Sequence, residues 1–403
     1  MVAGAETLLR TAEVWPQFRG PSGAGQCAAS SLPLYWSETE HVTWKTPVHD
    51  LGWSSPVIWE RQVWLTTATR DGKQMFAVCI DRQSGKVVHD LKVFDVERPE
   101  TLDKENSYAS PTPVIEAGRI YVHYGTYGTA CLDTATGQSL WANRDLHCNH
   151  EWGPGACPLL WEDLLIFAMD GIDVQYVVAL DKRTGQVVWK TTRSADYQGL
   201  PMRNRKAFCT PAVVEVNGRS QLVSPGANAT IAYEPRTGKE LWKISYRGEA
   251  LVPRPLAAHG LVFVTTDYTS PQFWAIRPDG SGDVTASHVA WKITRGMPRV
   301  PGPLVVGDLL YAVQDQGIVS AFEAASGQSV WKERVGGQYW ASPIAAGGRI
   351  YLSSFEGVTT VIEAGRQYKV LARNRLAGNI KASPAAVGNS LFLRTETHLY
   401  RID

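Results

Sequence analysis

Residues 179–189 read ALDKRTGQVVW, and versions of this stretch recur along the chain. In this copy Leu180 and an acid, Asp181, precede Gly185, and Trp189 follows the glycine by four positions. The same order recurs at Leu132 to Trp141, Tyr233 to Trp242 and Phe322 to Trp331. A glycine turn between two short, β-branched or aromatic runs predicts a hairpin whose second strand carries the tryptophan.

A second motif precedes each hairpin, in which a proline stands seven residues before an aliphatic residue. Seven copies begin at Pro56, Pro113, Pro158, Pro255, Pro303, Pro343 and Pro384, and an eighth copy, with an insertion, begins at Pro211. Successive prolines are 40 to 57 residues apart, which is the period of propellers and solenoids. Together the two motifs predict a unit of four short strands, too small to bury both of its faces alone.

The last repeat lacks its tryptophan strand. That tryptophan should follow Pro384 by the 28 residues that separate Pro113 from Trp141, beyond Asp403. A strand without a repeat of its own lies at the other end, at about Val42 to Thr46. We therefore expect an all-β, eight-bladed β-propeller of four-stranded antiparallel blades, closed by an N-terminal strand in the last blade. An open β-solenoid, the alternative architecture, would not require this strand.

The repeats predict one domain over residues 1–403, with residues 1–40 as an N-terminal extension and residues 41–403 as the eight blades. His89 stands where the first repeat should have tryptophan, and residues 279–283 are an insertion ahead of Trp291. We expect the repeat tryptophans to pack between blades and not to stack against a ligand. They are Trp44, Trp141, Trp189, Trp242, Trp291 and Trp331.

Composition excludes several classes of protein. The 40 Lys and Arg against 39 Asp and Glu give a net charge of +1, so no general field would attract nucleic acid. The longest apolar run, residues 164–169, is strand-sized, so no transmembrane segment is expected. Residues 1–6 lack the basic and apolar regions of a signal peptide. We expect a periplasmic or secreted monomer after signal removal, with a cytoplasmic protein as the alternative.

The repeat in residues 179–189 resembles the tryptophan docking motif of eight-bladed propellers with pyrroloquinoline quinone (PQQ) enzyme-like repeats, and the resemblance runs from Trp15 to Asp403. That family contains quinoprotein dehydrogenases, which bind PQQ with Ca²⁺, and cofactor-free members such as the outer-membrane assembly lipoprotein BamB, a protein-binding scaffold. The dehydrogenases carry two adjacent cysteines over the quinone, whereas no two of the six cysteines here are adjacent and no Cys-x-x-Cys-His motif occurs. The resemblance therefore implies a member without a cofactor, and PQQ with Ca²⁺ is the alternative.

Candidate binding residues lie just ahead of the repeat prolines, in the loops that should surround one mouth of the central channel. They are Trp53, Tyr108, Glu151, Trp152, Lys206, Arg254, Arg299, Tyr339, Trp340 and Lys381. Aromatic plates mixed with Lys and Arg suit a protein loop, a sugar or an anion. The loops between second and third strands should add acids, namely Asp71, Asp170, Asp173, Asp267, Asp315, Glu356 and Glu396. The alternative is that these are solvated loop residues in local ion pairs.

Three further features have a chemical and a plainer interpretation. Residues 147–151, His-Cys-Asn-His-Glu, could meet a Zn²⁺ ion, but hydrogen-bonded loop histidines are the simpler reading, and no metal is assigned. Residues 279–283 look like a Ca²⁺ turn but lack a downstream bidentate Glu, so a hairpin turn is preferred. Cys157 and Cys209 lie on neighbouring first strands, from which no disulfide can be inferred.

Two functions remain open. The first is a non-catalytic scaffold that binds a partner protein or a carbohydrate polymer at the channel mouth. The second is a propeller enzyme, either a divergent PQQ-dependent dehydrogenase or a carbohydrate lyase or hydrolase that uses Lys206, Arg254, Arg299 or a carboxylate as acid or base. We favour binding, because Trp, Tyr and Arg most often dominate binding energy and no cofactor motif accompanies them.

Overall fold

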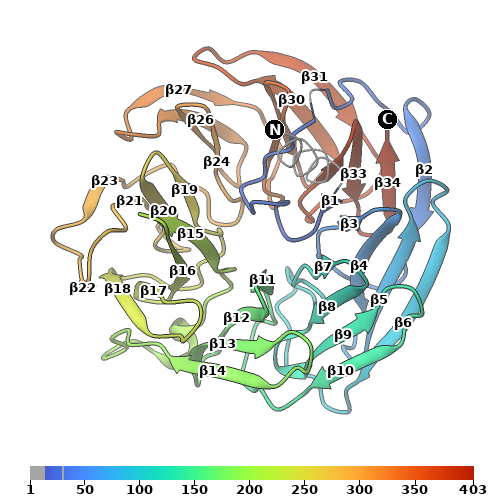
Figure 1. The fold of residues 1–403 in the computed structure, drawn as a ribbon. Coiled ribbons are helices and arrows are strands. Elements are labelled where there is room, and N and C mark those ends of the chain that lie inside the picture. The colour runs from blue at the N-terminus through green and yellow to red at the C-terminus, as the bar shows by residue number, and fades with distance from the viewer. Residues whose placement is uncertain (1–13, 30) are drawn as a thin grey trace.

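The computed structural model describes residues 14–29 and 31–403, and within them the strands form eight sheets arranged as a closed ring (Figure 1). Blade 1 contains β3 (Val57–Trp59), β4 (Gln62–Ala68), β5 (Gln74–Asp81) and β6 (Val87–Asp95). Blade 2 contains β7 (Val114–Glu116), β8 (Arg119–His123), β9 (Thr129–Asp133) and β10 (Ser139–Asn143). Blade 3 contains β11 (Leu159–Trp161), β12 (Leu164–Asp170), β13 (Gln175–Asp181) and β14 (Val187–Thr192). Blade 4 contains β15 (Ala212–Val216), β16 (Arg219–Gly226), β17 (Ala229–Tyr233) and β18 (Glu240–Ser245).

The remaining blades follow the same order from the channel outward. Blade 5 contains β19 (Leu256–Ala258), β20 (Leu261–Thr265), β21 (Phe273–Ile276) and β23 (Val289–Ile293). Blade 6 contains β24 (Leu304–Val306), β25 (Leu309–Val313), β26 (Ile318–Glu323) and β27 (Ser329–Arg334). Blade 7 contains β28 (Ile344–Ala346), β29 (Arg349–Ser353), β30 (Val358–Glu363) and β31 (Val370–Arg375). Blade 8 contains β32 (Ala385–Val387), β33 (Ser390–Arg394), β34 (His398–Ile402) and the N-terminal β2 (Val42–Pro47).

The closing strand pairs as the sequence predicts, which confirms the eight-bladed propeller. β2 runs antiparallel to β34, with Trp44 opposite Arg401 and Pro47 opposite His398. The blades depart from four strands in two of the sheets that the structure describes, because β1 (Val14–Trp15) joins blade 1 and β22 (Gly282–Asp283) joins blade 4. The only helical elements in the described residues are two short 3₁₀ turns, Gly125–Tyr127 and Met202–Arg205. None of the described helices is long and apolar enough to cross a membrane.

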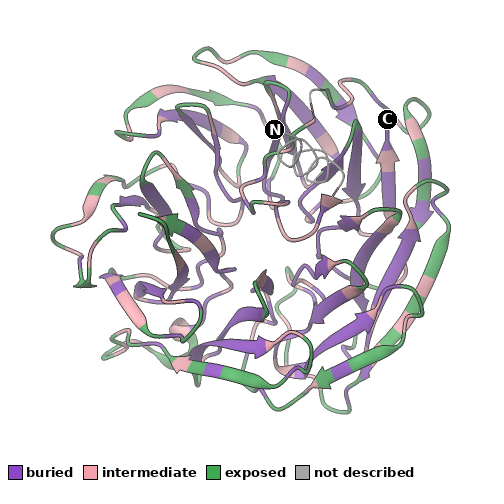
Figure 2. Ribbon diagram, in the orientation of Figure 1, coloured by how far each residue is buried: buried purple, intermediate pink, exposed green. Residues whose placement is uncertain are grey.

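Burial follows the position of a strand in its blade. All seven residues of β12 are buried, because a second strand is packed between two neighbouring blades. The outer strand β14 of the same blade is mostly exposed, and only Trp189 in it is buried. Figure 2 shows the same gradient around the ring, from buried inner strands to exposed outer strands. The core therefore consists of inter-blade layers and surrounds the channel.

The repeat tryptophans join each blade to the next. The Nε1 of Trp141 donates to Lys182 O at 3.0 Å, and the ring lies against Gly185, where a Cβ would come within 2.4 Å of it. Gly185 also has φ +72°, so the tight turn and the tryptophan contact both require glycine. Equivalent indole donations join Trp44 to Arg82, Trp189 to Pro235, Trp291 to Ala325 and Trp331 to Gly365. Packing between blades is thus confirmed for these five.

Trp242 departs from this pattern. It is fully buried, yet its Nε1 donates at 2.7 Å to Gln221 Oε1 of its own blade. The insertion explains the difference, because β22 pairs in parallel with β18, with Gly282 opposite Trp242. Residues 279–283 lie in the connection of the β21–β23 hairpin, as predicted, and within this connection β22 also links blade 5 to blade 4. The Asp283 carboxylate accepts hydrogen bonds from Thr285 and Ser245.

The N-terminal segment runs across the inner strands. β1 pairs with β3 of blade 1, and Gln26 forms a bridge with Ala345 of blade 7. Between these points Arg19 is buried and its Nη2 donates to Pro303 O at 2.7 Å. Residues 14–29 of the predicted extension are therefore part of the ring's centre, whereas the predicted leader, residues 1–6, lies outside the described residues.

Candidate functional site

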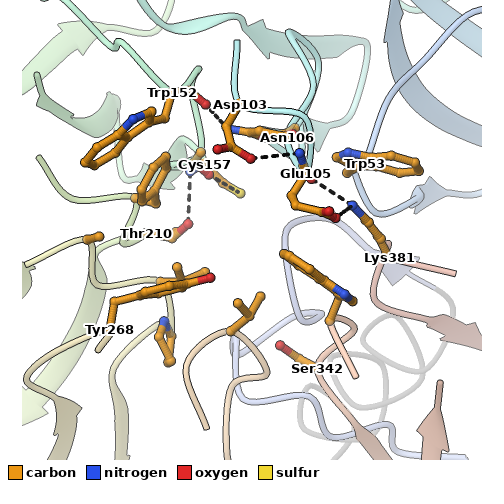
Figure 3. A pocket seen from close by; sticks show the side chains of 18 of the residues that line it. Trp53, Asp103, Glu105, Asn106, Trp152, Cys157, Thr210, Tyr268, Ser342 and Lys381 are labelled. Atoms are coloured by element: carbon orange, nitrogen blue, oxygen red, sulfur yellow. Dashed lines mark hydrogen bonds and ion pairs between the residues drawn. The ribbon is translucent and has the colours of Figure 1, made fainter. Parts of the chain in front are cut away.

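A cavity of about 530 Å³ lies at the channel mouth, on the side where the chain enters each innermost strand. We call this side the entry face. Of the ten predicted residues, five line the cavity: Trp53, Trp152, Arg254, Trp340 and Lys381. Figure 3 shows Trp152 and Tyr268 on one side of the open space and Trp53 and Lys381 on the other. The entry loops of five different blades supply the five predicted residues, so the cavity exists only in the closed ring.

The other five predicted residues do not line the cavity. Tyr339 and Tyr108 are buried in the inter-blade layers, and the Tyr108 hydroxyl donates to Glu100 O at 2.7 Å. Lys206 is buried against His150. Arg299 lies over the ring of Tyr268, 5.6 Å from its centroid, and so reaches the cavity only through that ring. Glu151 stands in a strained loop position with φ +52°.

The predicted acids do not line the cavity either. Most of them instead hold the entry loop of their own blade. The Asp315 carboxylate accepts from the backbone N–H of Arg299 at 3.0 Å, and Asp173 accepts from Asn149 N at 2.7 Å. Asp267 and Glu356 do the same for Glu249 and Gln338. Asp170 is the exception, because it is buried and forms a bidentate ion pair with Arg193. The Nε and Nη2 atoms of Arg193 lie 2.6 and 2.7 Å from the two carboxylate oxygens. These acids position the mouth mainly through hydrogen bonds to the backbone, whereas the plainer interpretation expected solvated residues in local ion pairs.

A belt of hydrogen bonds forms the floor of the cavity. It consists of the eight residues directly before the repeat prolines, six of which donate their backbone N–H to the side chain of their counterpart in the next blade. Ser342 N donates to Ser383 Oγ at 2.9 Å, and Ser383 N donates to Ser55 Oγ at 3.1 Å. The belt continues from Ser55 to Thr112, from Thr112 to Cys157 and from Cys157 to Thr210, and Gly302 N donates to Ser342 Oγ.

The belt is interrupted at Arg254, where the N-terminal segment enters the floor. The Arg254 guanidinium donates to Phe18 O at 2.9 Å, and Phe18 itself lines the cavity. A Cβ on Gly302 would lie 2.2 Å from Arg19 Nη1, so the missing side chain in the belt makes room for Arg19. The segment therefore closes the channel behind the cavity and gives it a bottom.

The rim includes a long loop, residues 96–113, between β6 and β7. The Lys381 ammonium donates to Glu105 O and to Glu105 Oε2, both at 2.8 Å. It also lies 4.9 Å from the Trp53 ring centroid and 4.4 Å from that of Trp340. On the other side Asn106 Nδ2 donates to Trp152 O at 2.7 Å. The loop therefore spans the mouth from blade 3 to the entry loop of blade 8.

Residues 147–151 form a hydrogen-bonded cluster. The backbone N–H of Thr126 donates to His150 Nε2 at 3.1 Å, and Lys206 Nζ lies 2.9 Å from His150 Nδ1. Burial lowers the pKa of Lys206 to about 8 and places the pKa of His150 well below its ordinary value. Both ring nitrogens have protein partners, so the plainer reading of this motif is confirmed. Among the described residues no group of three or more His, Cys, Asp or Glu could hold a metal ion.

The belt, the rim loop and the floor residue Phe18 were not predicted from the sequence. A signal existed for the first two. Six of the eight residues before the repeat prolines are Ser, Thr or Cys, and the interval from Pro56 to Pro113 is the longest, which indicates an insertion at the rim. No repeat marks Phe18. Cys157 and Cys209 are both free, and the Cys209 thiol donates to Pro253 O.

Comparisons with known proteins agree with this architecture. A family model described as outer membrane protein assembly factor BamB matches residues 36–191 and 173–403. The outer membrane protein assembly factor BamB of Moranella endobia is 27% identical over 197 residues, 45% of this chain and 48% of that protein. The tetrathionate hydrolase of Acidithiobacillus ferrooxidans is 22% identical over 254 residues, 60% of this chain and 49% of that protein. The chain thus spans about half the length of these curated relatives.

Among solved structures, a europium-containing methanol dehydrogenase is similar over 97% of this chain and 91% of its own, with a TM-score of 0.71 and 11% identity. At that identity the similarity shows the fold alone. The family model, in contrast, covers nearly all of the blades, and the predicted resemblance is confirmed. The chain belongs to the family of PQQ-like propellers represented by the outer membrane protein assembly factor BamB.

Proposed function

We propose that this protein is a non-catalytic propeller that binds a segment of a partner protein in the entry-face cavity. The observation that carries the proposal is the aromatic wall of the cavity, to which Trp53, Trp152, Tyr268 and Trp340 contribute from blades 1, 3, 5 and 7. All four are only half-buried, and each therefore keeps surface that a ligand can cover. Aromatic anchors around a concave site are typical of the centres of protein interfaces.

The charges around the wall support a peptide over a uniformly charged polymer. Both signs are present among the lining residues, with Lys104 and Arg203 alongside Asp103 and Glu249. Arg203 also lies over the ring of Trp152, 5.5 Å from its centroid. A site with mixed charge and aromatic plates matches a chain that offers both apolar and polar side chains. The relatives named for outer membrane protein assembly favour a protein partner over a carbohydrate polymer.

Substituting Trp340 tests this proposal. Trp340→Ala is expected to weaken capture of a purified partner by more than about 1 kcal/mol, roughly fivefold, with little change in melting temperature. The reason is that its half-buried ring faces the cavity, whereas its neighbour Tyr339 carries the packing. Trp161→Ala is the matched control, since Trp161 is also half-buried but lies at the opposite end of the innermost strand β11. Equal loss of capture in both variants would refute the assignment of the binding face.

An enzymatic function is the second candidate, because a dehydrogenase shares the fold. Two features of the cavity argue against a Ca²⁺-bound quinone. The one cysteine that lines the cavity is Cys157, whose Sγ accepts a hydrogen bond from Thr112 N at 3.2 Å. The rim acid Glu105 is engaged by Lys381. We therefore propose that the protein works without this cofactor.

Adding PQQ and Ca²⁺ to the purified protein distinguishes the two candidates. We expect no stoichiometric quinone absorbance to remain after gel filtration and no dye-linked oxidation of alcohols or sugars. Tight quinone uptake together with such oxidation would place the protein among the enzymes.

We also propose that the protein acts outside the cytoplasm, as the names of the relatives suggest. Fractionation of cells that produce the protein from its full genomic reading frame would test this. We expect the protein in the periplasmic or extracellular fraction, and recovery with the cytoplasmic markers would contradict the proposal.

A further inference from the structure

The centre of the propeller contains positive charge that no carboxylate balances. Four arginines are buried among the described residues, namely Arg19, Arg193, Arg254 and Arg394. Only Arg193 has a carboxylate partner, Asp170, which is also the only buried acid in the described part of the chain. The other three donate to backbone carbonyls and to uncharged side chains. Buried charges without a counter-charge are costly, so the imbalance itself points to a ligand.

Arg254 is the member of this group that reaches the cavity. It lines the floor, is 5% exposed, and its Nε has no hydrogen-bond partner among the described residues. Burial lowers the pKa of Arg254 to about 10, and burial together with the charge of Arg254 lowers the pKa of Arg19 to about 9. Because Arg254 disfavours the charge of Arg19, one anion near Arg254 would stabilise both guanidinium groups.

The belt adds donors to this charge. Ser55, Ser342 and Ser383 belong to blades 1, 7 and 8, and all three line the cavity. Each hydroxyl oxygen already accepts a backbone N–H, so each hydroxyl proton is left to donate. No acceptor for these protons is found in the described residues. Three acids also line the cavity: Asp103 and Glu105 lie in the rim loop, and Glu249 lies in the loop between β18 and β19.

We propose that the floor of the cavity binds an oxyanion, the carboxylate or phosphate-like group of a ligand, between Arg254 and the arc of Ser55, Ser342 and Ser383. This inference rests on the proposed function, since the ligand end that it describes would enter the same cavity. The aromatic wall then holds the body of the ligand and the floor holds its anionic end. A partner chain would satisfy both requirements with a C-terminal carboxylate that follows apolar residues.

Calorimetric titration of a blocked tetrapeptide, acetyl-Ala-Ala-Ala-Phe, tests the proposal when the free acid is compared with the C-terminal amide. We expect the free acid to bind at least about tenfold more tightly, because charge-assisted hydrogen bonds at a buried site are worth more than neutral ones. Arg254→Gln should remove this difference, while Arg236→Gln, an exposed arginine in ion pairs with Glu162 and Asp163, should preserve it. Equal binding of acid and amide to the wild type would overturn the inference for a peptide carboxylate.

A second measurement avoids variants that fold poorly and tests the other source of an oxyanion. Crystals of the unaltered protein soaked in sodium selenate should show an anomalous peak within hydrogen-bond distance of Arg254 and at least one belt serine. Absence of this peak, together with equal binding of acid and amide, would refute the site. Should that occur while Trp340→Ala still weakens partner capture, the inference fails and the proposed function stands.

Discussion

A chain that lacks residues 1–48 is expected to aggregate and to lose cooperative melting. The deletion removes β2, the outer strand of blade 8, and leaves β34 as an open sheet edge. It also removes Trp44, which is 9% exposed and joins blade 8 to Arg82 and Gly85 of blade 1. Loss of that ring alone should lower the free energy of unfolding by about 3 to 5 kcal/mol. Thermal unfolding followed by circular dichroism, with light scattering, measures both effects.

A shorter deletion, of residues 1–30, is the control. It removes the segment that closes the channel but retains β2, so the ring should still melt as one unit. A synthetic peptide of residues 38–49, added to the longer deletion, should restore part of the lost stability by pairing with β34. Unchanged melting of the chain without residues 1–48 would mean that β2 does not close the ring.

Replacing a repeat tryptophan by alanine should be the most damaging single substitution. Trp189→Ala is expected to lower the free energy of unfolding by about 3 to 5 kcal/mol, through lost burial and a cavity against Gly238. Trp189→Phe keeps most of the packing but loses the hydrogen bond to Pro235 O, so it should cost about 1 to 2 kcal/mol. Urea denaturation of the three proteins compares these values. A Trp189→Ala variant of normal stability that no longer bound a ligand would instead make this ring a ligand plate.

The ring could be predicted from sequence because its determinants are local and repeated. Gly185 and Trp189 lie in one hairpin, and the same geometry recurs wherever the pattern recurs. The closing strand could be predicted because the last repeat lacks its fourth strand, while the strand-like residues 42–46 belong to no repeat. Even the exceptional Trp242 follows from a visible insertion, although its parallel pairing with β22 does not.

The site was predicted less completely, because it depends on the direction of each side chain as well as on the position of the residue in its loop. Tyr339 and Trp340 are neighbours, yet one packs into the inter-blade core and the other faces the cavity, as adjacent side chains in extended chain do. Lys206 likewise points to His150. The belt joins residues of successive blades, and Arg19 lies in the chain some 235 residues from Arg254, so neither arrangement leaves a local pattern.

Site-specific photocrosslinking in cells tests most directly whether the entry-face cavity binds a partner protein. A photoreactive phenylalanine analogue would replace Trp340 at the cavity or Trp161 at the opposite end of β11. We expect a discrete crosslinked product from position 340, none from position 161, and loss of the product when Trp152 and Tyr268 are also replaced by alanine. Equal crosslinking from both positions, or a product from position 340 that persists in the absence of the two other aromatic rings, would contradict this expectation.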